Sequence, residues 1–154
     1  MIMKIFILAA SLAFASSAPG FAIAFEDIQH GVDVYNQGAE NAPDILKALL
    51  GDERVQIEVS KSDGTVLLAG LDTKDGLVVN TTAGEIEDPT IVVNATEDAI
   101  TKVIESDDPA AAFEEAKDNG EISIEGTTWS ARLKVAAALS STAVLSFLAS
   151  LLGK

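Results

Sequence analysis

The residue types that carry most enzyme chemistry are scarce in this chain. His30 is the only histidine among the 154 residues, and cysteine is absent. Thiol nucleophiles, disulfides and zinc ribbons are therefore excluded. The sequence also lacks a Gly-x-Ser-x-Gly elbow, a phosphate-binding loop and a dinucleotide-binding glycine pattern. We predict no catalytic residue, no cofactor and no enzymatic function, and we expect His30 to lie in an exposed N-terminal region.

Pairs of acidic residues offer the other chemistry to consider. Asp107-Asp108 and Glu114-Glu115 have the residue types of acid–base pairs or of calcium ligands. Each pair is better explained as a helix cap or as a solvated helix face. The segment 72–76 lacks the alternating oxygen ligands of a calcium loop and is typical of a hairpin turn. We therefore predict no metal site.

The overall charge excludes another class of function. The chain has 10 basic and 24 acidic residues, which gives a formal net charge of −14. Nucleic-acid binding depends largely on Lys and Arg replacing counterions along the phosphate backbone. We therefore expect no nucleic acid as a partner. The composition is also 48% hydrophobic, which indicates that apolar and charged residues lie in different segments.

The N-terminal segment has the order of a secretory signal peptide. Lys4 precedes an uncharged apolar run over 5–15, a break over 16–20 follows, and Ala22-Ile23-Ala24 offers a cleavage site with small residues at its first and third positions. The run is shorter than the ~20 residues that cross a bilayer. We expect residues 1–24 to be a signal peptide cleaved after Ala24. The alternative is that the uncharged segment 5–24 stays as a membrane anchor. In both cases the protein would be exported, as a secreted or membrane-tethered protein.

The body of the chain is predicted to be mixed α and β. Short helices are expected over 25–51, where Pro43 is placed to begin the second helix and Gly51 to end it. Segment 54–59 alternates strictly, so Val55, Ile57 and Val59 should face a core and the polar residues should face water. Further strands are expected over 65–71, 77–80, 90–94 and 121–125, and the Asp-Gly turns among them indicate an antiparallel meander.

Helical segments are expected in the second half of the chain. Thr96 is placed to cap the first, over 97–105, and Asp107-Asp108-Pro109 to begin the second, over 110–117. From Thr128 the pattern is helical to the C terminus.

The C-terminal segment 135–152 is uncharged and has 18 residues. Its length makes it a candidate for a membrane span, but five Ser and Thr residues and several alanines reduce its hydrophobicity. Its leucines gather on one side of a helical wheel. Three roles stay open: a core helix or lid, a helix in a membrane interface, and a true span.

The order of motifs from Asp88 to Leu133 resembles the sterol carrier protein type 2 family. An Asp-Pro strand is followed by a helix, by an Asp-Pro-x-x-Ala-Phe helix ending its motif at Phe113, and by a strand bounded by Gly120 and Gly126. The resemblance implies an α+β fold: a five-stranded, largely antiparallel sheet covered by helices, with an apolar tunnel for a lipid. It also implies a sterol-carrier-like lipid-binding domain over 52–139, after N-terminal helices over 25–51 and before an apolar C-terminal helix over 140–154. Gly126-Thr127-Thr128 and Trp129 depart from the usual pattern, so the identity of the ligand does not carry over.

The predicted helices have more apolar surface than is needed to cover one face of a small sheet. Aliphatic side chains suit an acyl chain, because each buried methylene contributes ~0.8 kcal/mol. The predicted lining of the tunnel is Ile100, Val103, Ile104, Phe113, Ile122, Ile124, Trp129, Leu133, Leu139 and Leu145. The function predicted is non-catalytic binding, and possible transfer, of a sterol, fatty acyl or isoprenoid lipid. The alternative is a structural or interaction domain at the cell surface, in which the same residues fill the core and the C-terminal helix contacts a membrane or a partner.

Overall fold

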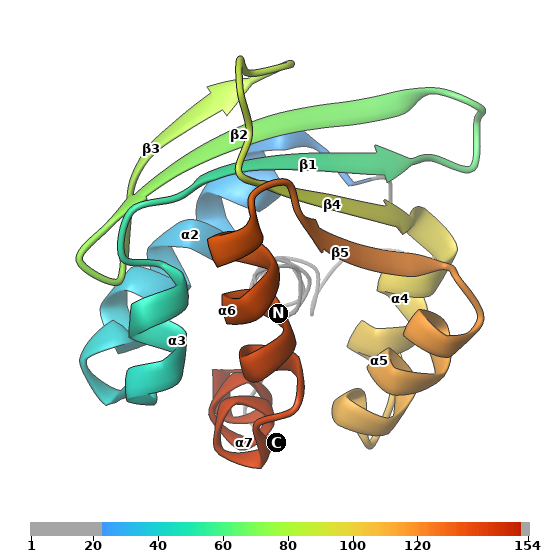
Figure 1. Cartoon of the computed structure of the whole chain (residues 1–154). Helices are drawn as coiled ribbons and strands as arrows, with labels where there is room; N and C mark the ends of the chain where they lie inside the picture. The colour runs from blue at the N-terminus through green and yellow to red at the C-terminus, as the bar shows by residue number, and fades with distance from the viewer. Residues whose placement is uncertain (1–22, 152–154) are drawn as a thin grey trace.

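A computed structural model describes residues 23–151 of the chain. Its elements, in chain order, are α2 (Phe25–Gly38), the short 3-10 helix η1 (Ala39–Asn41), α3 (Asp44–Leu49), β1 (Arg54–Ser60), β2 (Val66–Lys74), β3 (Leu77–Ala83), β4 (Ile91–Thr96), α4 (Glu97–Glu105), α5 (Pro109–Asp118), β5 (Ile122–Gly126), α6 (Trp129–Leu139) and α7 (Thr142–Leu151). The strands form one five-stranded sheet, and Figure 1 shows the helices on one face of it. The predicted α+β class is confirmed.

The order of strands in the sheet is β3-β2-β1-β4-β5. β1 pairs with β4 in parallel, and the other three pairs are antiparallel. The prediction of a largely antiparallel sheet is therefore correct. The turn between β2 and β3 has positive φ at Asp75 (54°) and Gly76 (84°), as the Asp-Gly pair predicts.

Alternation along β1 sets the inner face of the sheet. Val55, Ile57 and Val59 are all buried, as predicted. The expectation that every polar residue of this strand faces water is wrong for Gln56, which is also buried. Its Nε2 donates to the carbonyl oxygens of Ala69 (3.1 Å) and Gly84 (3.2 Å). A loop after β3 covers this part of the outer face, so an outward polar side chain is enclosed.

The same loop explains a glycine in β2. The amide of Ile86 donates to Gln56 Oε1 at 2.7 Å, which holds the loop against the sheet. A Cβ at Gly70 would overlap the side chain of Ile86. The glycine therefore makes room for the loop to close over the outer face.

Side-chain caps begin the three central helices. Thr96 Oγ1 accepts the amide of Ala99, Asp108 Oδ1 accepts that of Ala111, and Thr128 Oγ1 accepts that of Ala131, each at 3.1 Å. Such caps satisfy amides that have no partner within the helix. The predicted caps at Thr96 and Asp108 are confirmed.

The segment from Thr128 onward, whose pattern is helical throughout, forms two helices. α6 ends at Leu139 and α7 begins at Thr142. Ser140 Oγ donates to the carbonyl oxygen of Ala137 at 3.0 Å, and Ser141 Oγ accepts the amide of Val144 at 3.3 Å. The hydroxyl groups of these two serines form hydrogen bonds with nearby backbone groups. Such bonds compete with those of a continuous helix and so favour a break between α6 and α7. Within the described chain, no helix has the length and hydropathy needed to cross a membrane.

The predicted signal peptide falls mostly on residues 1–22, which lie outside the described residues. Ile23 and Ala24 are described, and Ala24 is the N-cap residue of α2.

Candidate functional site

The site predicted from sequence centres on the edge strand β5 and on α4 and α5, which lie beneath that end of the sheet (Figure 1). Four of its predicted residues are buried in the hydrophobic core: Ile100, Val103, Phe113 and Ile122. Helical spacing places Ile100 and Val103 on the inner side of α4, which has Thr101 and Lys102 elsewhere on its circumference. All four positions therefore contribute apolar side chains to this part of the core.

Strand pairing supplies the floor of the site. Val93 on β4 pairs with Ile124 on β5, and Ala95 pairs with Ile122. The same inner face continues onto β1, where Ile57 pairs with Val93 and Val59 with Ala95. The register thus lines up alkyl side chains across three neighbouring strands.

Partly buried apolar side chains lie at the edge of the hydrophobic core. The predicted residues Ile104, Ile124, Leu139 and Leu145 are each partly exposed. Ile104, Ile124 and Leu139 pack against the core, and so do three partly buried residues that were not predicted: Ala112, Phe147 and Leu151. They come from α4, α5, β5, α6 and α7, so five elements bring partly accessible apolar surface to the edge of the core.

The remaining two predicted residues lie elsewhere. Trp129 is 75% exposed and Leu133 is 53% exposed. They stand four residues apart and so share the outer face of α6, whereas Ala131, Val135 and Ala138 form its buried face. The helical pattern alone could not tell which face of α6 turns inward, because its small alanines are the buried residues.

The C-terminal helix α7 packs with its apolar side inward. Val144 is fully buried, and Phe147 and Leu151 are partly buried against the core. The outward positions include Thr142 and Ser150. α7 contacts α2, α5 and α6, so it packs on the body as a helix of the core.

A buried carboxylate lies at the N-terminal end of α4. Glu97 is 7% exposed, and its Oε2 accepts the amide of Ile23 at 3.0 Å. Its Oε1 accepts from the Ser62 amide (3.3 Å) and the Ser62 hydroxyl (3.0 Å). Burial acts to raise the pKa of Glu97, but these hydrogen bonds, together with Lys61, outweigh it and lower the pKa below its ordinary value. The sequence assigned Glu97 to the first turn of a helix but gave no sign of its burial.

An ion pair attaches α6 to the start of β1. Lys134 Nζ lies 3.0 Å from Glu53 Oε1, and the Glu53 side chain is 6% exposed. The backbone beside it is fixed too, because the amide of Glu53 donates to Thr73 Oγ1 at 2.9 Å. Both charged groups lie at the end of the sheet, so neither belongs to the apolar floor.

The end of β5 lies directly against α6. A Cβ at Gly126 would come 2.6 Å from the carbonyl carbon of Ala131 and would also overlap the amide nitrogen of Arg132. The side chain of Arg132 returns to this strand, because its Nε donates to the carbonyl oxygen of Gly126 at 3.1 Å. Glycine here permits the close approach of helix and strand.

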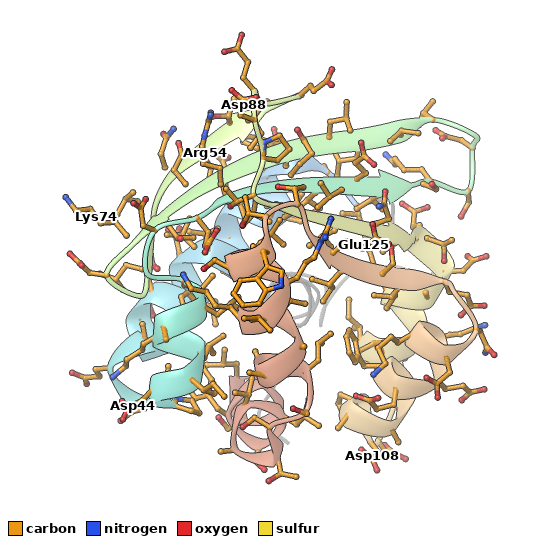
Figure 2. The ribbon with its side chains drawn as sticks, in the orientation of Figure 1. Asp44, Arg54, Lys74, Asp88, Asp108 and Glu125 are labelled. Atoms are coloured by element: carbon orange, nitrogen blue, oxygen red, sulfur yellow. The ribbon has the colours of Figure 1, made fainter. Side chains whose placement is uncertain are left out.

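Groups suited to catalysis are not gathered at this site. His30 is exposed, as predicted. Glu125 is exposed, and Figure 2 shows Asp108 at the outer edge of the body, where it serves as the cap of α5. Glu114 pairs with Lys117 at 2.8 Å on the surface of the same helix. The part of the chain that the structure describes contains no cluster of His, Asp and Glu suited to a metal ion.

Comparisons with known proteins were made by sequence and by structure. The sequence matches no protein-family model and no curated protein. By structure, the sterol carrier protein domain 2 of Helicoverpa armigera matches with a TM-score of 0.52 and 15% identity, over 88% of this chain and 97% of that chain. A crystal structure of sterol carrier protein 2 matches with a TM-score of 0.49 and 17% identity, over 79% and 92%. Sterol carrier protein 2 from Yarrowia lipolytica, in its apo form, gives 0.44 and 18%, over 79% and 97%. The match to the Helicoverpa armigera domain shows that the arrangement of strands and helices in this chain is the sterol carrier protein 2 fold.

Proposed function

We propose that this protein binds a lipid, with the alkyl part of the ligand buried among the side chains of α4, α5, β5, α6 and α7. The observation that carries the proposal is the chemical uniformity of this region. Its floor is built from Val93, Ala95, Ile122 and Ile124, and its wall from Phe113 and the apolar face of α4. Such a surface offers an alkyl chain burial and no polar competitor.

The buried polar residues lie at the edge of this region or away from it. Those of the described chain are Glu53, Gln56, Thr73 and Glu97. Gln56 serves the outer face of the sheet, Glu53 and Thr73 its far end, and Glu97 the N-terminal end of α4. Each of them already has hydrogen-bond partners within the fold. We therefore expect none of them to form a hydrogen bond with the ligand. Specificity would then come from shape and length.

Burial alone supplies enough free energy for such binding. At ~0.8 kcal/mol for each methylene, a 16-carbon tail gains roughly 12 kcal/mol before entropic costs. The entropic costs reduce the net free energy of binding, so the complex is expected to be reversible. An apolar tunnel is the form of site that this proposal requires.

The structural comparison supports the same class of ligand. The Helicoverpa armigera domain, with which this chain shares its fold, is named a sterol carrier protein. We extend to this chain the general property of non-covalent lipid binding. A sterol, a fatty acyl chain and an isoprenoid all fit an aliphatic surface, and the role as carrier is part of the proposal.

We also propose that the protein acts after export. The apolar run over 5–15 and the small residues before position 25 support a secretory leader. A lipid-binding protein outside the cytoplasm would be secreted or tethered to the membrane.

Mass spectrometry of the co-purified lipid tests the binding proposal. The full chain is purified without detergent and extracted with organic solvent, and the extract is compared with that of the Phe113→Trp variant, which adds bulk at the centre of the site. We expect a stoichiometric lipid from the natural chain and much less from the variant. An empty extract from a folded natural chain, together with no uptake of added fatty acid, would contradict the proposal.

A second function, contact with a membrane surface, is supported by the exposed pair Trp129 and Leu133. An indole and a leucine that share one helix face suit the interface between lipid and water. The net charge of −14 argues against anionic lipids, so the surface in question is zwitterionic. Trp129 is the only tryptophan, and a blue shift of its emission with phosphatidylcholine vesicles tests this contact. An emission spectrum that vesicles leave unchanged would contradict it.

A further inference from the structure

Ile23 and Ala24 are built into the fold, although they stand at the end of the predicted leader. The Ile23 side chain is 2% exposed and belongs to the hydrophobic core. Its amide donates to Glu97 Oε2 at 3.0 Å. Ala24 is the N-cap residue of α2, and its amide donates to Asp27 Oδ2 at 2.8 Å. The folded domain therefore begins at Ile23 or before it.

Cleavage after Ala24 would take these contacts away. The core would lose the Ile23 side chain, Glu97 would lose its backbone donor, and α2 would begin without its N-cap residue. The leader contains a second sequence with the required pattern, because Gly20-Phe21-Ala22 also places small residues at the first and third positions before a cut. A cut after Ala22 leaves all three contacts in place.

We propose that the leader is removed between Ala22 and Ile23, and that the new α-ammonium group of Ile23 pairs with the Glu97 carboxylate. The inference rests on the proposed export of the protein. In the step itself, an endoprotease that processes leaders hydrolyses the peptide bond with one water molecule. The carboxylate of Ala22 leaves with the leader, and the amine of Ile23 takes up a proton.

The surroundings of Glu97 suit this pair. Ser62 occupies Oε1 through its amide and hydroxyl, so Oε2 faces Ile23 alone among the described hydrogen bonds. The amide nitrogen of Ile23 already lies at hydrogen-bonding distance from that oxygen. Conversion to an ammonium group adds a charge and two N–H donors at the same atom, which strengthens the bond to a carboxylate.

The N terminus of the exported protein tests the proposal. The full chain is expressed with its own leader in an exporting bacterial host, and the mature product is measured by intact mass and by N-terminal sequencing. We expect Ile23 as the first residue. A product that begins at Phe25 would overturn the inference and leave export intact, whereas an uncleaved chain retained inside the cell would overturn both.

Two matched variants separate the two cleavage sites. Gly20→Asp places a charge at the third residue before the proposed cut, where a small residue is required, so we expect it to block processing. The same residue is the fifth before a cut that follows Ala24, so this variant should leave such a cut unaffected. Ala24→Leu removes the small residue needed for a cut after position 24, so we expect the product still to begin at Ile23. The reverse pattern would show that cleavage follows Ala24.

The pairing with Glu97 has its own readout. In the mature protein, acetylation of the N-terminal amine by a limiting reagent is followed by mass spectrometry. We expect Glu97→Gln to increase the rate several-fold, because the amine is then held less firmly as an ammonium ion. The exposed neighbour Asp98→Asn should leave the rate unchanged. Equal rates in all three proteins would overturn the pairing.

Discussion

Lys134 on α6 reaches Glu53, the residue before β1, with 3.0 Å between Nζ and Oε1. Eighty-one positions separate the two in the chain, and their contact fixes α6 beside the first strand. Because the Glu53 side chain is buried and that of Lys134 is 36% exposed, the carboxylate depends on this one cation for its charge partner among the described ion pairs.

Removing the cation should therefore destabilise the fold. We expect Lys134→Met to lower the free energy of unfolding by about 1–3 kcal/mol, since it leaves a buried carboxylate unpaired while solvent reaches part of the site. The double variant Glu53→Gln with Lys134→Met should recover part of the loss. Urea unfolding followed by circular dichroism measures both, and a single variant as stable as the natural chain would contradict this role.

Gly126→Ala should disturb the junction of β5 and α6. The added Cβ would meet backbone atoms of Ala131 and Arg132, which cannot move aside as a side chain can. We expect a loss of about 1–3 kcal/mol, which is usual for overpacking. Gly38→Ala is the matched control, because its Cβ would meet only the tip of the Leu151 side chain at 3.1 Å. Thermal unfolding compares the two, and equal melting temperatures would count against the close approach.

The single tyrosine gives a pH-dependent signal. Tyr35 is fully buried, its hydroxyl donates to the carbonyl oxygen of Gly76 at 2.7 Å, and burial raises its pKa to about 12. The folded pKa is above the unfolded value, so this contribution to stability is present below pH 10 and is lost as pH rises toward 12. Absorbance at the tyrosinate band should show ionisation well above pH 10 in the folded chain. A midpoint near the ordinary value in a chain that stays folded would contradict the burial.

Glu97 should give the opposite dependence at low pH. Its folded pKa is lowered from 4.5, so its contribution is present above that value and is lost as pH falls through the lower, folded pKa. We expect Glu97→Gln to make stability depend less on pH in the acidic range. The exposed neighbour Asp98→Asn is the control. Urea midpoints measured from neutral pH down to about pH 3 test this, and parallel curves for Glu97→Gln and the natural chain would contradict it.

Local sequence patterns predicted most of the fold. Alternation in β1, the caps at Thr96 and Asp108 and the Asp75-Gly76 turn depend on neighbours in the chain, which a single sequence displays. The burial of Gln56 and Glu97 depends on distant segments, the loop at Ile86 and the residue Ile23, that fold over them. The helical pattern from Thr128 onward did not by itself show the break at Ser140, because serine is compatible with a helix and also competes for its backbone hydrogen bonds.

Local spacing also predicted part of the candidate site, but it did not predict which face of α6 is buried. Val103, Phe113 and Ile122 belong to apolar stripes whose inner side is plain from their spacing. Trp129 and Leu133 also form a stripe, but alanines cover the inner face of α6 because its backbone lies close to β5. Size, which is usually a good guide to burial, is a poor guide where a helix packs so tightly.

Binding of a fluorescent fatty acid to the natural chain and to four variants tests the central claim most directly. Ile124→Trp and Ile104→Trp add bulk at partly buried positions of the proposed site, and Val79→Trp adds it at an exposed position of β3. Filling the space of about two methylenes should weaken binding roughly tenfold. His30→Ala should leave it unchanged, because no histidine chemistry is involved. The account predicts saturable binding by the natural chain, Val79→Trp and His30→Ala, and weak binding by the other two. Absence of binding by the folded natural chain, or equal affinity in all five proteins, would contradict it.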